Sequence, residues 1–295
     1  IPYDCLRYEN EDSIEQMGWA IGQEILKGAR YVKKHPQLFA VYVTNFSCGP
    51  DSFLVGYFRD IMKNKPSLTL ELDSHSADTG INTRIEAFLD IVERFKKLNI
   101  QDQEQSPFSP ARLEIKRSQI RYISSEGVSV SLYDPRVKVV FPSMGRITTE
   151  IAAATFRGIG FNADSVPNPS FKTLLAGRGN TSCKECLPLI LTVGSLLEYL
   201  EQRKDEKELT LYFMPTTSGG CRFSQYHVFL KKLVGKKQLK NVAFLSLNTA
   251  NSYGGVMGTF DMIKIVYGLI IGDIMDDIKN VILALAKDKE KALQI

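Results

Sequence analysis

Short apolar runs alternate with stretches of helical periodicity along the first third of the chain. Residues 13–34 place apolar side chains three and four positions apart, as one face of a helix requires. Residues 38–45 form a β-branched and aromatic run between a His-Pro and a Gly-Pro pair, which is typical of a buried strand. In chain order the pattern predicts a helix over 13–34, a strand over 38–45, a helix over 52–63, a strand over 68–72 and a helix over 82–97. This alternation favours a parallel sheet.

The same alternation returns after a polar stretch. Residues 99–118 are polar and contain two prolines, so we expect a linker there. Beyond it the pattern predicts strands over 137–141, 159–163, 209–214 and 241–247, and helices over 147–157, 187–203 and 223–234, with further helices closing the chain. Residues 164–186 are rich in Gly, Pro and Asn and poor in periodicity. They are predicted to form a long loop, and loops of that length are usually functional.

The fold class predicted from these elements is α/β, with two Rossmann-like lobes built on parallel sheets. The first lobe covers residues 1–118, with the linker at its end, and the second covers residues 119–295. Each half contains a helix, a strand, a turn with a cysteine, a helix and a strand in the same order, so we interpret the halves as a repeat in outline. Parallel α/β domains bind ligands at the carboxyl edge of the sheet. We therefore expect a cysteine-lined cleft between the lobes.

Composition and charge narrow the class of protein. With 295 residues, 44% hydrophobic and 24% charged, the chain resembles an ordinary globular protein of about two domains. The net charge of +4 is small and scattered, which argues against a nucleic-acid partner. The longest uncharged apolar run, Ile265–Gly272, has eight residues, whereas a membrane span needs about 20, so no membrane partner is predicted. The chain begins at Ile1 with no signal-peptide pattern, and we expect a fragment of a longer polypeptide.

Five cysteines carry the candidate chemistry of the chain. They are Cys5, Cys48, Cys183, Cys186 and Cys221. An odd number of cysteines without a secretion signal argues against a disulfide framework and for a cytoplasmic location.

The placement of these cysteines suggests metal binding. Cys48 and Cys221 each follow a predicted strand and precede a predicted helix, and the C-x-x-C pair at 183 and 186 precedes another helix. Helix N-termini stabilise thiolates, and grouped thiolates suit a soft metal or an iron–sulfur cluster. Gly49 follows the first of these cysteines, and Gly219 and Gly220 precede the last. Without side chains, these glycines let backbone N–H groups approach inorganic sulfur closely.

Other interpretations of the cysteines stay open at this point. A cysteine at a strand end is often a small buried hydrophobe, and one C-x-x-C can be half a zinc site, a redox pair or chance. A thioredoxin-like pair would follow a strand directly, whereas coil is predicted over 177–182. A zinc ribbon needs a second C-x-x-C, and the sequence has none.

A histidine provides a weaker candidate. His75 lies between Asp73 and Asp78 in a loop predicted to follow a strand. Such a site can transfer protons or bind a ligand, and it can equally be a hydrogen-bonded loop. The chain has no P-loop and no G-x-G-x-x-G motif, so no ATP site is predicted in it.

Four stretches together resemble a known family. They are residues 45–53 (NFSCGPDSF), 71–81 (ELDSHSADTGI), 182–188 (SCKECLP) and 217–226 (TSGGCRFSQY). In this order they resemble the acyl-CoA dehydratase activase-related proteins, which are similar to the 2-hydroxyacyl-CoA dehydratase and double-cubane-cluster proteins of anaerobes. The resemblance extends over nearly the whole chain.

The resemblance implies an iron–sulfur cluster, of the 4Fe-4S or double-cubane type, bound between two Rossmann-like lobes. Carried over motif by motif, Cys48, Cys183, Cys186 and Cys221 are the implied ligands. Cys5 matches none of the family's motifs and is the least supported ligand.

The function implied by the resemblance is low-potential electron transfer. An ATP-hydrolysing activator domain, in the same polypeptide or separate, would be the electron donor, as in the activator of 2-hydroxyglutaryl-CoA dehydratase. The chain would then be an oxidoreductase component. Two alternatives remain: a 2-hydroxyacyl-CoA dehydratase-like lyase that binds an acyl-CoA substrate and uses His75 as a base, and a metal-free scaffold that only docks the activator.

Overall fold

The computed structural model describes residues 1–14, 17–98, 108–116, 119–205, 207–217, 219–246 and 258–292. Its contacts divide the chain into two units. Unit 1 consists of Ile1–Pro107, Thr181–Leu187 and Ser218–Gln225, and unit 2 of Phe108–Asn180, Pro188–Thr217 and Tyr226–Ile295. Unit 1 thus combines the first third of the chain with two short segments from later in the sequence. The predicted lobes of residues 1–118 and 119–295 stay a prediction about folding domains.

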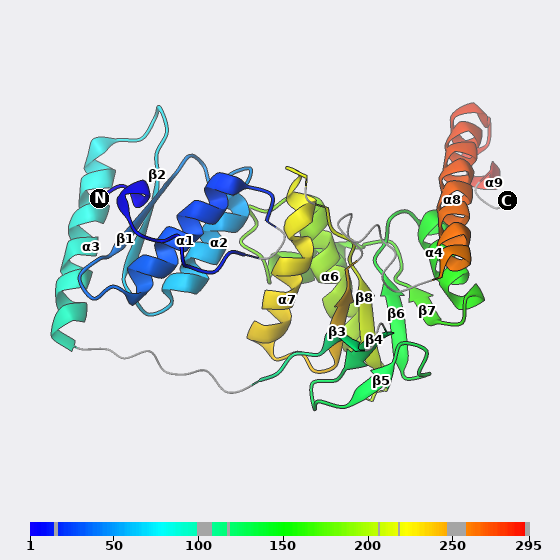
Figure 1. The fold of residues 1–295 in the computed structure, drawn as a ribbon. Coiled ribbons are helices and arrows are strands. Elements are labelled where there is room, and N and C mark those ends of the chain that lie inside the picture. The colour runs from blue at the N-terminus through cyan, green and yellow to red at the C-terminus, as the bar shows by residue number, and fades with distance from the viewer. Residues whose placement is uncertain are drawn as a thin grey trace. The chain divides into compact units, whose positions relative to one another are not determined.

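Unit 1 is a small α/β layer with a two-stranded parallel sheet (Figure 1). Its elements are η1 (Tyr3–Cys5), α1 (Ala20–Lys34), β1 (Ala40–Thr44), α2 (Asp51–Met62), β2 (Ser67–Glu71) and α3 (Asp78–Leu98). The strands run in register from Ala40 opposite Ser67 to Thr44 opposite Glu71. Helix α2 is the most buried element, with Phe53, Tyr57 and Met62 each at most 2% exposed. The predicted order of helix and strand in this region is confirmed.

Helix α1 begins later than its periodicity predicts. It starts at Ala20 instead of residue 13. The Gln23 side chain explains the difference, because it accepts a hydrogen bond from the Ile14 N–H at 2.8 Å and donates to the Ile14 carbonyl at 2.6 Å. Ile14 and Met17 are buried without being helical. Apolar spacing therefore marked burial here and not helix.

Unit 2 contains a four-stranded parallel sheet in the order β7-β6-β8-β9. The strands are β6 (Val137–Phe141), β7 (Asn162–Ser165), β8 (Leu209–Phe213) and β9 (Val242–Leu245). Its helices are α4 (Arg146–Gly158), α5 (Phe171–Arg178), α6 (Leu187–Gln202, whose first residue belongs to unit 1), α7 (Tyr226–Lys237), α8 (Thr259–Leu285) and α9 (Lys289–Ala292), with η2 (Arg222–Gln225) in unit 1 preceding α7. Val137 and Val139 of β6, Leu211 of β8 and Ala243 of β9 are completely buried. Strands covered on both faces read as continuous apolar runs, which is why the sequence located them. The predicted α/β class with parallel sheets is confirmed.

An antiparallel sheet in unit 2 was not predicted. Strands β3 (Arg112–Lys116), β4 (Gln119–Ile123) and β5 (Ser129–Ser131) form a meander in that order. The predicted linker over 99–118 is therefore wrong from Arg112 to Lys116, and residues 99–107 and 117–118 lie outside the described residues. These strands alternate apolar with charged or other polar side chains, and this high polarity is typical of a linker. Tyr122 is completely buried, and its hydroxyl donates to the Thr210 carbonyl at 3.3 Å.

The predicted loop over 164–186 is also wrong in part. Helix α5 lies inside it, and a capping box on Ser170 and Thr173 begins the helix. Strand β7 begins at Asn162, three residues later than predicted. Only eight residues long, α5 is too short to show a clear period.

Helix α8 packs beside α4 (Figure 1). The contact uses Gly268 and Gly272 of α8, each of which lies against a threonine of α4, Thr155 and Thr148 respectively. Much of the remaining surface of α8 is apolar and exposed. Among the described residues, no helix is long and apolar enough to cross a membrane.

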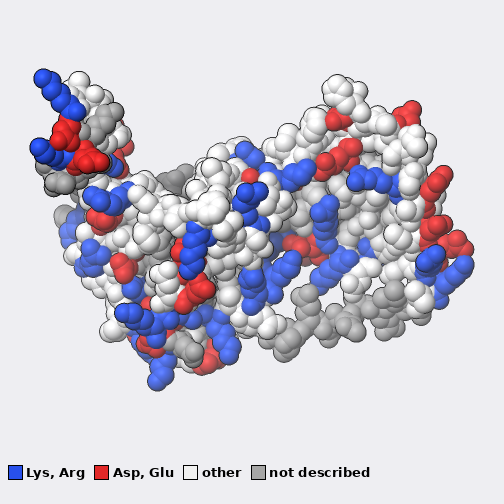
Figure 2. Space-filling model, turned by 180° about the vertical axis from the view of Figure 1, so that it is seen from behind, with Lys and Arg blue, Asp and Glu red and all other residues white. Residues whose placement is uncertain are grey.

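Charged side chains of both signs are interspersed on the face drawn in Figure 2. This distribution agrees with the small net charge of +4.

Candidate cysteine site

All five cysteines belong to unit 1. Cys5 ends η1, and Cys48 lies in the turn between β1 and α2. Cys183 and Cys186 lie in the segment Thr181–Leu187, and Cys221 lies in Ser218–Gln225. The contacts of these two segments are with unit 1, although their neighbours in the sequence belong to unit 2. Tertiary structure thus assigns to one unit cysteines that lie more than a hundred residues apart in the sequence.

The thiols are accessible. Cys5, Cys48, Cys183 and Cys221 are exposed, Cys186 is half-buried, and none of the five forms a disulfide. The alternative that they are small buried hydrophobes is therefore wrong for the four exposed residues. Exposed thiols are the ones available to a metal or an oxidant.

The residue types fit an iron–sulfur cluster, and there is room beside them. A Cβ atom built on Gly49 or Gly220 would meet no atom within 4 Å, so a ligand can approach both backbones. Gly49 has φ +59°, a conformation that favours glycine. Gly219 is exposed in the same turn as Gly220. In the described part of the chain, however, no group of three or more His, Cys, Asp and Glu residues is placed so that it could hold a metal ion.

The Cys48 turn and the C-x-x-C segment both contain strained backbone. Phe46 and Ser47, just before Cys48, have φ of 58° and 50°, and Cys183 has φ of 61°. Side chains disfavour this left-handed region by roughly 1–2 kcal/mol per residue. Such conformations persist only where surrounding contacts enforce them. The contacts that do so involve Lys184 and Glu71.

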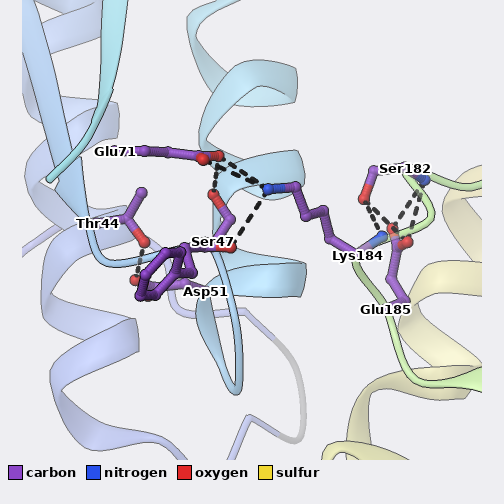
Figure 3. A network of polar contacts seen from close by, with 8 residues as sticks. Thr44, Ser47, Asp51, Glu71, Ser182, Lys184 and Glu185 are labelled. Atoms are coloured by element: carbon purple, nitrogen blue, oxygen red, sulfur yellow. Dashed lines mark hydrogen bonds and ion pairs between the residues drawn. The ribbon is translucent and has the colours of Figure 1, made fainter. Parts of the chain in front are cut away.

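Lys184 connects the C-x-x-C segment to the Cys48 turn (Figure 3). Its Nζ donates to the Phe46 carbonyl at 3.3 Å and to the Glu71 carboxylate at 3.1 and 3.4 Å. Ser47 Oγ donates to the same carboxylate at 2.7 Å. Glu71, the last residue of β2, therefore joins both loops. The hydrogen bond from Ser47 and then that from Lys184 hold the pKa of Glu71 below its usual value.

The C-x-x-C segment also has internal order. The Glu185 carboxylate is largely buried and accepts hydrogen bonds from the Ser182 N–H at 3.0 Å and the Ser182 hydroxyl at 2.9 Å. The Lys184 N–H donates to Ser182 Oγ at 3.3 Å. The two cysteines are thus carried on a turn that folds around its own side chains.

The Cys48 turn is anchored to the sheet by Asp51. Its carboxylate accepts hydrogen bonds from the Tyr42 hydroxyl at 2.8 Å and from the Thr44 hydroxyl. Burial, followed by the bond to Asp51, raises the pKa of Tyr42. Ser52 Oγ donates to the Gly49 carbonyl at 2.7 Å. The first turn of α2 is therefore fixed directly behind Cys48.

Trp19 connects the third cysteine segment to unit 1. Its Nε1 donates to the Gly220 carbonyl, next to Cys221, at 3.0 Å. Its ring lies 6.1 Å from that of Phe53 in α2. Trp19 is the only tryptophan of the chain.

His75 lies in a hydrogen-bonded loop. The Asp73 carboxylate accepts hydrogen bonds from the His75 N–H at 2.8 Å and from Ser76 Oγ at 2.9 Å. The bond made by His75 involves its backbone and not its imidazole. A role of His75 as a base therefore stays a prediction.

Sequence reasoning missed Trp19, Glu71 and Lys184 as parts of this site. Lys184 stands between the two cysteines of the C-x-x-C pair and Glu71 begins a stretch already singled out, so each had a local signal. Their partners lie too far away in sequence to be assigned from it. Comparisons with protein-family models, curated proteins and solved structures found no match for this chain.

Proposed function

We propose that this chain is the iron–sulfur electron-transfer component of an ATP-dependent, low-potential reduction system of the 2-hydroxyacyl-CoA dehydratase activator type. The observation that carries the proposal is the assignment of all five cysteines to one contact unit, although three of them lie late in the sequence. The order of the four motifs in the sequence supplies the functional class.

The residues of the chain would have distinct roles at the site. Cys48, Cys183, Cys186 and Cys221 would hold the cluster, which would supply one-electron transfer when bound. Hydrogen bonds to the cysteine sulfurs, net charge and solvent exposure set the potential of such a site. The backbone N–H groups of the glycines at 49 and 220 are the candidate donors.

Partners follow from the same proposal. An ATP-hydrolysing activator domain would donate the electron, because the sequence contains no ATP-binding motif of its own. The exposure of four of the five thiols supports docking of such a donor near the cysteines. An acyl-CoA or another small substrate would accept the electron.

Anaerobic reconstitution tests the proposal. We expect about four or eight irons per chain with matching sulfide. Cys48→Ala and Cys221→Ala should each remove visible cluster absorbance and leave the far-UV circular dichroism unchanged. Cys5→Ala is the matched control and should retain absorbance, because Cys5 matches none of the four motifs.

Trp19 offers a second measurement. A cluster bound through Cys221 would quench the emission of this single tryptophan, since the indole is hydrogen-bonded to the neighbouring residue. Retained absorbance in both the Cys48 and the Cys221 variants would overturn the ligand assignment. Reconstituted protein with no iron would instead favour the metal-free scaffold.

A further inference from the structure

We propose that Lys184 and Glu71 act as positioning residues that set the distance between the C-x-x-C turn and the Cys48 turn. The inference deepens the proposed function, because these are the turns that would have to converge on one cluster. The pair is called the clasp below, and it consists of the Lys184 ammonium and the Glu71 carboxylate.

The geometry of the clasp is specific to these two turns. Lys184 lies one residue after Cys183, and the carbonyl of Phe46, to which it donates at 3.3 Å, lies two residues before Cys48. The Glu71 carboxylate accepts from Lys184 at 3.1 Å and from Ser47 at 2.7 Å. Lys184, Phe46 and Ser47 therefore each lie within two residues of a cysteine. Their common partner, Glu71, lies at the end of β2.

Glu71 is fixed in position because it lies at the end of strand β2. Glu71 pairs with Thr44 in the parallel ladder, and the Thr44 hydroxyl donates to Asp51 at the start of α2. The Cys48 turn and Glu71 are thus held by the same sheet. The C-x-x-C turn is not part of this sheet, and Lys184 is the side chain that joins it to Glu71 and to the Cys48 turn.

The clasp is a weak, partly exposed ion pair. The side chains of Lys184 and Glu71 are 46% and 42% exposed, and half-exposed ion pairs bias an equilibrium by about fivefold at most. Such a bias leaves global stability nearly unchanged and still alters the population of turns close enough to share a ligand. Because exposed charges are screened by ions, the bias should vanish in about 1 M salt.

Cross-linking of the full chain, without metal, tests the proposal. We would treat the reduced protein with a short flexible bis-maleimide, which joins two thiols without any redox step. The yield of peptide linked between Cys48 and Cys183 would be followed by mass spectrometry over time. Lys184→Gln and Glu71→Gln should each lower the initial rate of this link by about two- to fivefold at low salt.

Controls separate positioning from a general loss of structure. The charge swap that combines Glu71→Lys with Lys184→Glu should restore part of the rate, because it re-forms the ion pair but removes the donor to the Phe46 carbonyl. Lys172→Gln is the control. It breaks the more exposed ion pair with Glu201, at 3.1 Å, and the pair with Glu198, at 3.8 Å, neither of which involves a cysteine segment, and it should not change the rate. The two single variants should also match the parent protein in about 1 M salt.

The outcomes also separate this inference from the proposed function. Equal linking rates in the parent chain and in both single variants at low salt would overturn the clasp, whether or not the protein binds iron. A rate difference in a protein that never takes up iron would support the clasp and contradict the cluster. If one single variant does not fold, the other still tests the pair, because either change removes the same interaction.

Discussion

At the scale of single residues, the side chains that order this site are not the cysteines themselves. Lys184 extends from the C-x-x-C segment and donates to the Phe46 carbonyl and the Glu71 carboxylate, and Trp19 donates to the Gly220 carbonyl beside Cys221. The backbone of Gly220, next to Cys221, is open, and its carbonyl accepts the hydrogen bond from the Trp19 indole. Positions of the cysteines at strand–helix junctions followed from the sequence, but these contacts did not.

A buried lysine illustrates the same point away from the site. Lys65 is 7% exposed, and its ammonium donates to the Val32 carbonyl at 2.6 Å and to the carbonyls of Lys33 and His35 at the end of α1. A cation there stabilises the C-terminal carbonyls of the helix. Burial lowers the pKa of Lys65, because desolvation disfavours the charged form.

We expect Lys65→Met to lower the free energy of unfolding by about 1–3 kcal/mol, because the carbonyls lose their donor. Urea denaturation followed by circular dichroism measures the change. Lys63→Met, two residues earlier and exposed, is the control and should change the midpoint little. Equal losses in both variants would contradict the capping role.

At the scale of elements, two glycines allow the backbones of α5 and α6 to approach closely. A Cβ on Gly177 of α5 would lie 1.9 Å from the Ile190 carbonyl oxygen, and one on Gly194 of α6 would lie 1.9 Å from the Thr173 carbonyl oxygen. The backbones of the two helices are therefore in direct contact. The C-x-x-C segment is the connection between these helices, so both of its ends begin at a close-packed helix pair.

Gly194→Ala should destabilise the protein by at least about 2 kcal/mol, since backbone atoms cannot move away as a flexible side chain can. Gly56→Ala in α2 is the matched control, because a Cβ there meets nothing within 4 Å. The control should gain up to about 1 kcal/mol from helix propensity. Urea midpoints of the two variants should thus move in opposite directions, and a shift in the same direction would contradict the close approach.

At the scale of the whole molecule, α8 leaves a large apolar surface. Tyr267, Ile270 and Ile274 are between 49% and 63% exposed on this helix, while its other face packs on α4 through glycines and through a hydrogen bond from the Thr148 hydroxyl to Asp276 at 2.6 Å. Contiguous exposed apolar surface of this kind promotes association.

We expect the double variant Ile270→Lys and Ile274→Lys to lower concentration-dependent self-association without lowering the melting temperature. Sedimentation velocity over a range of concentrations measures the first and thermal denaturation the second. Ile265→Lys is the contrasting variant. Ile265 is partly buried against the main core of unit 2, so this change should lower the melting temperature. A melting temperature lowered equally by both would show that the surface is not free.

The sequence by itself determined the α/β class, the order of most helices and strands, and the positions of Cys48, Cys183, Cys186 and Cys221 relative to them. These follow from local patterns: apolar runs mark strands such as β6 and β8, and turns with glycine mark the junctions. The sequence did not predict strand β3, whose apolar and charged residues alternate, or the eight-residue helix α5, because their local signals are weak. Tertiary structure alone decided that the segments with Cys183 and Cys221 belong with Cys48, because the side chains that join them, Lys184 to Glu71 and Trp19 to Gly220, act across 113 and 201 residues of chain. Hydrophobic periodicity indicates which side chains are buried. A hydrogen-bond partner more than a hundred residues away, in contrast, is determined only by the tertiary fold.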